Sequence, residues 1–151
     1  MAADSIVVRG WSKRTDNFSK LVSINDMIIG GTGSAEEISL LVHFSKTHRP
    51  ETASERDVLE FIVEFSRWKK DYGDATISNE YMIAYGGHLF RVSNMFVVEV
   101  HNYDAIGAGE DFANAVLYLG HDAVDAVKVA CELCCFVAEP VVSFEMKRGT
   151  K

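Results

Sequence analysis

The first part of the chain alternates between β-type segments and small or polar residues. Strands are expected over residues 4–8 and 20–30, with a polar link over residues 9–17 between them. The small-residue run Gly30-Gly31-Thr32-Gly33 interrupts the second pattern, and Ser34-Ala35-Glu36-Glu37 follows with the spacing of a helix capping box. The pattern therefore predicts strands first and a helix that begins after residue 34.

Apolar residues recur at three-and-four spacing in two successive segments, which is the pattern of a buried helical face. The inner stripe of the first segment contains Ile38, Leu41, Val42 and Ser45. The stripe of the second contains Val58, Phe61, Ile62, Phe65 and Trp68. Pro50 ends the first helix, because proline disfavours helical geometry in the preceding residue, and Ser54 is the expected N-cap of the second. The aromatic residues are interpreted as core and not as a ligand site.

The second half of the chain repeats this organisation. Expected strands cover residues 76–85, 88–93, 96–100 and 141–146, and expected helices carry Phe112 to Leu117 and Val124 to Cys134. Gly86-Gly87 predicts a tight hairpin turn, Gly120 a helix C-cap, and His121-Asp122 the start of the last helix. The order β-β-α-α-β-β-β-α-α-β, with helix pairs between antiparallel strands, predicts an α+β layered protein.

Composition narrows the class of protein. The chain has 151 residues, of which 48% are hydrophobic and 25% charged, with two prolines, as is usual for a folded globular protein. No linker or internal repeat divides it, so one domain is expected over residues 1–151. A net charge of -7 argues against a binder of duplex nucleic acid, which needs a basic face. No apolar run approaches the roughly 20 residues of a membrane span and no signal peptide is recognisable, so a cytoplasmic location without membrane contact is expected.

Neither a metal nor a cofactor is predicted. Cys131, Cys134 and Cys135 form an odd cluster that suits reduced thiols, and their C-x-x-C pair lacks the two further ligands of a structural zinc site. Gly107 and Gly109 form a G-x-G without the third glycine of a dinucleotide-binding turn. The histidines are scattered over separate elements and are interpreted as structural or exposed.

Residues at the joints of this element order resemble the proteasome β-subunit family, including its bacterial ATP-dependent protease homologue and the short proteasome-like proteins of phages and prophages. The matching segments are Ala2-Ala3-Asp4, Lys20 to Ile24, Gly30 to Gly33, and Ala105 to Gly109 followed by Phe112-Ala113. The last of these looks like the family's A-I-G-S-G motif. The resemblance implies a four-layer αββα sandwich, the N-terminal-nucleophile (Ntn) hydrolase fold, in which each of two antiparallel sheets is covered by a helix pair.

The resemblance also implies a site. In that family an N-terminal threonine acts as nucleophile and base, and Asp4 and Lys20 fall on the two positions that tune it. The lysine would lower the pKa of the threonine amine, and the aspartate would hold the lysine. The other interpretation is that Asp4 opens an exposed strand and that Lys20 is a strand-edge charge. Ala108 stands at the family's serine position.

Candidate ligand-binding positions are the small residues Gly30, Gly31, Thr32, Gly33, Gly107 and Gly109. The threonine is expected about a dozen residues before Asp4, so the fold is expected to be truncated at the N-terminus and to lack the nucleophile. The expected function is therefore a catalytically inactive protein that acts by binding, as a homo-oligomer and as a phage or prophage factor that engages a host protein. The alternatives are a threonine-type peptidase or amidohydrolase whose first strand lies upstream, and a protein that sequesters a small anionic ligand at Lys20.

Overall fold

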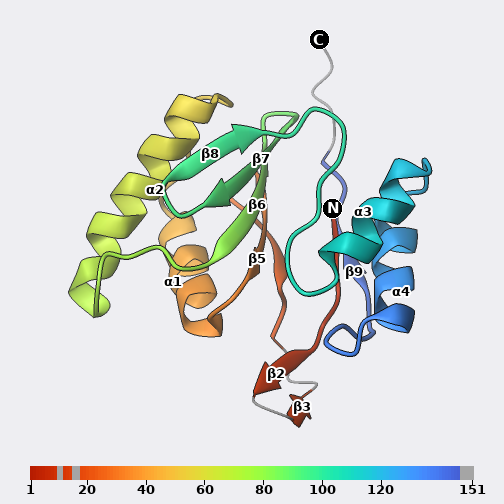
Figure 1. Ribbon diagram of the computed structural model, residues 1–151. Coiled ribbons are helices and arrows are strands. Elements are labelled where there is room, and N and C mark those ends of the chain that lie inside the picture. The colour runs from red at the N-terminus through yellow and green to blue at the C-terminus, as the bar shows by residue number, and fades with distance from the viewer. Residues whose placement is uncertain (10–11, 15–17, 147–151) are drawn as a thin grey trace. The chain divides into compact units, whose positions relative to one another are not determined.

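The structure is a computed structural model, which describes residues 1–9, 12–14 and 18–146 (Figure 1). The described residues fall into two compact units. Unit 1 comprises Met1–Leu21 and Asn102–Glu145, and unit 2 comprises Val22–His101 with residue 146. Each unit has its own strands and its own helix pair, so each is described by itself.

Unit 2 is built on a sheet with the strand order β4-β5-β6-β7-β8. The strands are β4 (Leu21–Ile24), β5 (Met27–Thr32), β6 (Glu80–Tyr85), β7 (His88–Ser93) and β8 (Phe96–Glu99). From β5 to β8 all neighbours are antiparallel. The predicted hairpin between β6 and β7 is confirmed, and Gly86 and Gly87 adopt φ of 58° and 87°, which favour glycine.

The single strand predicted over residues 20–30 is wrong, because β4 and β5 are separate strands joined by a turn. Asn25 and Asp26 form that turn with φ of 49° and 63°, and these two residue types tolerate left-handed backbone better than most. Gly30 and Gly31 also do not break the strand, since β5 continues through them. A Cβ on Gly31 would lie 2.9 Å from the ring of Tyr81, so glycine is needed there for close packing.

Two helices cover the sheet of unit 2, α1 (Ala35–Ser45) against β5 and α2 (Glu55–Lys69) against β8, and the short η1 (Lys70–Tyr72) extends α2 (Figure 1). The predicted inner face of the second helix is confirmed for its buried members. The largest buried side chains of the unit include Leu41, Val58, Phe61, Ile62, Phe65, Tyr81, Ile83 and Phe90. Burial of each contributes about 1.5–3 kcal/mol relative to exposure. This core fixes the helix pair on the sheet.

The capping box predicted at Ser34 and Glu37 is wrong. Among the described residues, the Ser34 side chain makes no hydrogen bond to the first turn of α1. Instead the Asn79 side chain accepts from the Ser34 backbone N–H at 2.7 Å and donates to the Ser34 carbonyl at 2.8 Å. The predicted cap at Ser54 is confirmed, because its hydroxyl accepts from the Asp57 backbone N–H at 3.1 Å.

Glu37 points into the core of unit 2 and not toward its own helix start. Its buried carboxylate accepts from the backbone N–H groups of Ser78 and Asn79, both at 3.1 Å, and from the Tyr81 hydroxyl at 2.9 Å. Lys69 of α2 pairs with it at 3.2 Å. Burial, followed by the negative charge of Glu37, raises the pKa of Tyr81 well above its usual value. The carboxylate therefore ties α1, α2 and β6 together.

Unit 1 contains short strands and the helices α3 (Glu110–Tyr118) and α4 (Ala123–Leu133). Strand β1 (Ala2–Ala3) pairs antiparallel with β9 (Val142–Ser143), and β2 (Val7–Arg9) with β3 (Ser12–Arg14). Helix α3 packs against α4, and α4 packs against β1. Asp122 caps α4 by accepting from the Asp125 N–H at 2.9 Å, which confirms the predicted start of the last helix.

Two strand predictions in unit 1 need correction. Of the strand predicted over residues 4–8, only residues 7 and 8 are in a strand, β2, and the two-residue strand β1 lies before the predicted range. Ser5 bonds the Ala138 carbonyl in the segment that follows α4 and does not pair with a neighbouring strand. The predicted last strand is reduced from residues 141–146 to β9. The polar residues 12–14 form β3 through backbone pairing that hydropathy does not report, and residues 10–11 and 15–17 of the predicted link lie outside the described residues.

The antiparallel strands and segregated helix pairs of both units make this an α+β protein, as predicted. The stacking of the elements into four layers and the single domain over residues 1–151 stay predictions. In the part of the chain that the structure describes, no helix is long and apolar enough to span a membrane.

Candidate functional site

Asp4 and Lys20 form an ion pair in unit 1. Lys20 Nζ lies 2.9 Å from Asp4 Oδ1 and 3.0 Å from Oδ2, so the ammonium bonds both carboxylate oxygens. Asp4 directly follows β1 and Lys20 directly precedes β4, which brings together side chains that are sixteen residues apart. The Lys20 side chain is 24% exposed and that of Asp4 12%. The pair is partly shielded from solvent, and its attraction is stronger than that of a surface pair.

The Asp4 carboxylate is also held by the backbone. The N–H groups of Ile6 and Ala138 approach Asp4 Oδ2 at 3.4 and 3.5 Å, and the Ser5 N–H donates to the Ala138 carbonyl at 3.3 Å. These contacts are long and individually weak. Together they fix the residues after β1 to the segment after α4, and they orient the carboxylate that holds Lys20.

Cys131 lies on α4 close enough to feel the charges of this pair. Burial raises the pKa of the Cys131 thiol above its ordinary value. The carboxylates of Asp4, Glu139 and Glu132 raise it further, and the ammonium of Lys20 opposes them. The raised pKa keeps the Cys131 thiol protonated at neutral pH. Since the thiolate is the reactive form, Cys131 is a poor nucleophile.

Ala108 lies between Gly107 and Gly109, and the backbone conformation of the first and the close packing of the second require glycine. Gly107 has φ of 96°, and a Cβ on Gly109 would lie 3.0 Å from both Ala130 Cβ and Val137 Cγ2. Gly109 is therefore needed for the close approach of α3 to α4 and its following segment. Ala108 itself is exposed and offers only a methyl group.

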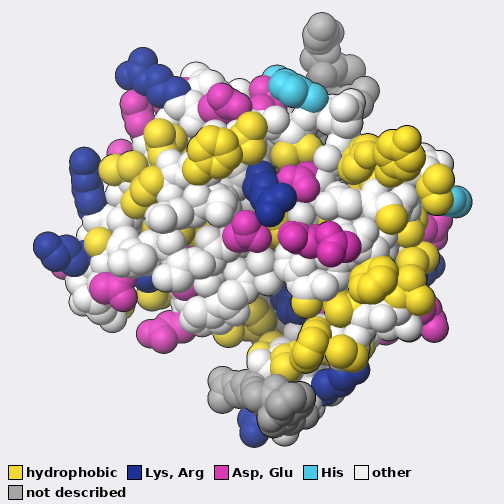
Figure 2. Space-filling model, in the orientation of Figure 1, with side chains coloured by type: hydrophobic (Ala, Val, Ile, Leu, Met, Phe, Trp, Pro, Cys, Tyr) yellow, Lys and Arg dark blue, Asp and Glu magenta, His cyan; other side chains and the backbone are white. Residues whose placement is uncertain are grey.

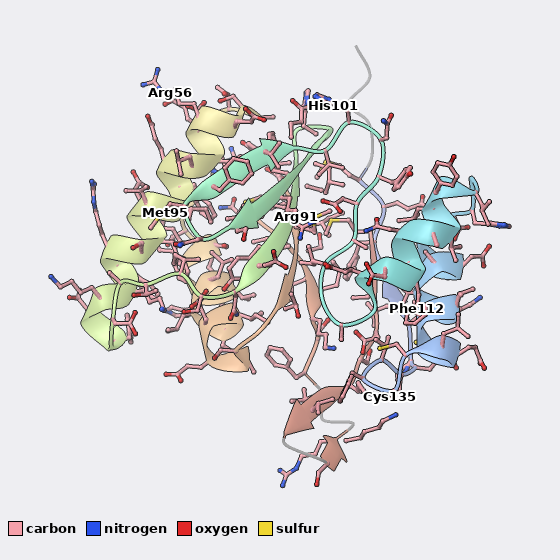
Figure 3. The ribbon with its side chains drawn as sticks, viewed as in Figure 1. Arg56, Arg91, Met95, His101, Phe112 and Cys135 are labelled. Carbon is pink, nitrogen blue, oxygen red and sulfur yellow. The ribbon has the colours of Figure 1, made fainter. Side chains whose placement is uncertain are left out.

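A side chain at the C-terminal end of α4 contacts the backbone carbonyl of Ala108. Cys134 Sγ donates to the Ala108 carbonyl oxygen at 3.4 Å. Cys134 thus links the end of α4 to the Ala108 turn, Cys131 lies within electrostatic range of the Asp4–Lys20 pair, and Cys135 beside them is exposed (Figure 3).

The predicted positions Gly30 to Gly33 belong to unit 2, away in sequence from the residues described above. Gly31 packs against the ring of Tyr81, and Gly33, with φ of 118°, lies against the amide of Asn79. Thr32 is the last residue of β5. These contacts account for Gly31 and Gly33 by packing, and the role of residues 30–33 in ligand binding stays a prediction.

Sequence reasoning missed part of the site. The backbone N–H groups of Ile6 and Ala138 carry no signal in the residue pattern, because any residue but proline supplies one. The cysteines did carry a signal, since Cys131 and Cys134 belong, at helical spacing, to the apolar stripe of the last expected helix. Only their placement beside Asp4 and Ala108 could not be obtained from that spacing.

Comparison with protein-family models and with curated proteins finds no match. Solved structures are similar in fold. BPH from Thiobacillus denitrificans, in complex with epoxomicin, superimposes with a TM-score of 0.84 at 23% identity, covering 97% of this chain and 92% of that protein. HslV from Trypanosoma brucei gives 0.67 at 20% identity over 93% and 88%. Anbu, an ancestral β-subunit from Yersinia bercovieri, gives 0.63 at 15% identity over 93% and 73%.

These neighbours are proteasome-like Ntn hydrolases, so this chain has a proteasome-like α+β fold. The predicted fold class is confirmed. At these identities the likeness establishes the fold and leaves the activity to the residues of the site.

Proposed function

We propose that this chain is a proteasome-like protein that acts by binding and does not hydrolyse peptides. The observation that carries the proposal is the turn at Ala108. Where the resemblance places a serine hydroxyl that supports the catalytic amine, this chain presents a methyl group, and the carbonyl of the same residue accepts the Cys134 thiol. A methyl group neither donates nor accepts a proton, so the hydroxyl's part in proton transfer is lost.

The surroundings of the ion pair support the same proposal. Its described neighbours supply the backbone N–H groups of Ile6 and Ala138 and the protonated thiol of Cys131. None of these groups is an activated nucleophile. The pair therefore acts as a structural tie between the start of the chain and the segment after α4.

A threonine-type peptidase or amidohydrolase is the second candidate, and the intact Asp4–Lys20 pair is what favours it. A lysine ammonium at this position would lower the pKa of an N-terminal amine placed beside it, as the family mechanism requires. A nucleophile would then have to come from residues that precede Met1.

The third candidate, capture of a small anion at Lys20, has weaker support. The Lys20 ammonium already bonds both oxygens of Asp4. An anionic ligand would compete with a carboxylate that the backbone holds in place, so its net gain from Lys20 is small.

The proposed partners are further copies of this chain and a host-cell protein. Exposed apolar side chains at the end of α3 support self-association, because Tyr118 and the C-cap residue Leu119 are 77% and 73% exposed. Phe112 in the first turn of the helix is 37% exposed (Figure 3). Figure 2 shows apolar side chains gathered over this helix. The host protein is proposed from the resemblance to phage and prophage proteins, and the cytoplasm is the proposed location.

The test uses protein expressed with its native upstream region. Intact mass is measured before and after incubation with epoxomicin, the compound in the Thiobacillus complex, and hydrolysis of a panel of fluorogenic peptides is followed. We expect no adduct and no turnover above that of Lys20→Ala. An adduct, or turnover that Lys20→Ala abolishes and the exposed-site control Lys128→Ala retains, would establish the peptidase instead.

Ala108→Ser makes this test sharper. If Ala108 alone had silenced an otherwise complete hydrolase, restoring the hydroxyl would raise turnover by about 10²-fold or more. Under the binding proposal, Ala108→Ser leaves the protein inactive, and the Asp4–Lys20 pair contributes only to stability.

A further inference from the structure

A hollow of about 150 Å³ lies on unit 2 where α1 ends beside α2. It is lined by His43, Phe44, Lys46, Thr47, His48 and Trp68. Phe44 is buried and forms its floor, whereas the polar members are exposed. The hollow has no part in the site of unit 1 or in the function proposed above.

Aromatic rings form the walls of the hollow. The Trp68 ring lies 5.5 Å from that of Phe44 and 5.8 Å from the imidazole of His43, measured between centroids. The His48 ring stacks on Phe44 at 4.0 Å with an interplanar angle of 8°. His48 covers the buried ring of Phe44, so the rings that remain accessible are those of His43, His48 and Trp68. Accessible flat rings favour a flat ligand, because offset stacking gains contact area without a hydrogen bond.

The rim of the hollow is basic although the chain as a whole is acidic. Residues 38–50 contain no Asp or Glu, whereas the chain has a net charge of -7. Two histidines and Lys46 stand on the rim. In residues 1–9, 12–14 and 18–146, Lys46 has no ion-pair partner, whereas Arg49 pairs with Asp26 and Lys69 with Glu37.

The carbonyl end of α1 does not oppose an anion here. The Phe44 carbonyl accepts the backbone N–H groups of Thr47 and His48 at 3.3 and 3.1 Å, and the Ser45 carbonyl accepts Asn25 Nδ2 at 3.2 Å. These bonds satisfy groups that otherwise give a helix C-terminus its negative character. The Lys46 side chain is exposed, so its ammonium is accessible to a ligand.

We propose that this hollow binds a small planar anion, of which an aromatic carboxylate is the simplest member. The ring lies against Trp68 and the imidazoles, and the carboxylate meets Lys46 at the rim. Ordinary ligand pockets measure about 300–1,000 Å³, so a hollow of this size takes one ring with one anionic group and not a larger ligand.

The test is a titration of ¹⁵N-labelled protein with benzoate, observed at the indole N–H of Trp68. The chain has two tryptophans, and the variant Trp11→Phe leaves Trp68 as the single indole signal. We expect a saturable shift with a Kd on the order of 1 mM, as for fragment-sized ligands. Benzamide, which has the same shape without the charge, should bind about tenfold more weakly or worse.

Variants separate this site from general surface binding. Lys46→Gln should weaken benzoate binding about tenfold, and Lys128→Gln, an exposed lysine on α4, should leave it unchanged. Unchanged signals elsewhere in the spectrum show that each variant is folded. The proposal is overturned if the Trp68 signal does not saturate, if benzamide binds as tightly as benzoate, or if the two lysine variants behave alike.

Discussion

At the residue scale, burial and neighbouring charges decide what each ionisable side chain does. Lys20 and Lys69 have the same chemistry, yet the first holds the carboxylate at the start of unit 1 and the second balances Glu37 inside unit 2. Cys131 and Cys135 differ in the same way, because one lies against carboxylates and the other is exposed. Two predictions follow from these environments.

The first concerns thiol reactivity at the site. Cys131 should react with iodoacetamide about tenfold more slowly than Cys135 at pH 8, since burial and nearby carboxylates raise its pKa and lower its thiolate fraction. Asp4→Asn removes one of those carboxylates and should speed the reaction of Cys131. Peptide mass spectrometry over time measures both rates, and Cys135 serves as the internal control. Equal rates for the two thiols would contradict the placement of Cys131.

The second concerns stability at alkaline pH. The folded pKa of Tyr81 is raised by burial and by Glu37, so the folded state keeps its phenol proton where the unfolded state, with a pKa of about 10, loses it. The unfolded state then binds fewer protons, and the free energy of unfolding falls by about 1.4 kcal/mol per pH unit above pH 10. Below that pH the contribution is present in full.

Denaturant unfolding at several values between about pH 9 and about pH 11.5 measures this slope. Tyr81→Phe should lower stability by about 1 kcal/mol near pH 8, because the hydrogen bond to Glu37 is lost, and should flatten the alkaline fall. Tyr118→Phe alters a tyrosine that is 77% exposed and should change neither quantity. The same slope in wild type and Tyr81→Phe would show that another group causes the loss.

At the scale of elements, helix ends in unit 2 are satisfied in two different ways. Helix α2 is capped locally, because the Ser54 hydroxyl accepts from the backbone N–H of Asp57, three residues later. Helix α1 is capped by Asn79, which comes from a segment 45 residues away. The same serine-first sequence pattern thus precedes both helices, and only one of the serines caps with its side chain.

This difference predicts opposite results for two matched substitutions. Ser54→Ala should lower the free energy of unfolding by about 1 kcal/mol, whereas Ser34→Ala should change it by less than about 0.5 kcal/mol. Asn79→Ala should cost about 1–2 kcal/mol, since it removes a buried side chain that bonds both the N–H and the carbonyl of Ser34 and leaves that part-buried N–H unpaired. Thermal and denaturant unfolding give all three values. A large loss for Ser34→Ala would mean that the predicted capping box forms after all.

At the scale of the whole molecule, a proteasome-like fold is combined with a site for which we propose altered chemistry. Similarity to BPH and HslV extends over more than nine-tenths of this chain, yet the turn that carries a serine in the resembled family carries Ala108 here. Packing constrains a fold through many small contacts, while catalysis depends on a few polar atoms. One substitution can therefore remove the chemistry and leave the architecture.

The proposed self-association gives a prediction at this scale. Replacing both Tyr118 and Leu119 with glutamate puts charge on the exposed apolar end of α3, which should shift the protein to a smaller species in light scattering coupled to size-exclusion chromatography. Phe96→Glu alters an equally prominent apolar side chain on β8, which is 66% exposed, and should leave the mass unchanged. If only Phe96→Glu dissociates the protein, the contact lies on unit 2 instead.

Much of the architecture could be predicted from the residue pattern. The spacing of Phe61, Ile62 and Phe65, the glycines at 86 and 87, and the caps at Ser54 and Asp122 gave elements that the structure contains. The errors occurred where the local signal was ambiguous. Apolar residues on both sides of Asn25 and Asp26 predicted one continuous strand where the structure has a turn. The polar residues 12–14 predicted a link where the structure has the strand β3.

The candidate site was predicted only through family spacing. Nothing in the pattern around Asp4 or Lys20 distinguishes a paired charge from an exposed one, and the other interpretation, an unpaired strand-edge charge, is equally consistent with it. The structure shows the pair, its backbone donors and the neighbouring thiol. Its role in catalysis or binding stays a prediction for the experiments above.

The sequence alone determined the helices, the Gly86-Gly87 turn and the α+β class, because periodicity, turn chemistry and capping act between residues a few positions apart. Only the tertiary structure decided that Glu37 enters the core, that Asn79 caps α1 and that Lys20 bonds Asp4. Those outcomes depend on groups 16 to 45 residues apart along the chain. Such groups meet only when the strands and helices between them have packed, and burial then makes an unpaired polar atom too costly to leave.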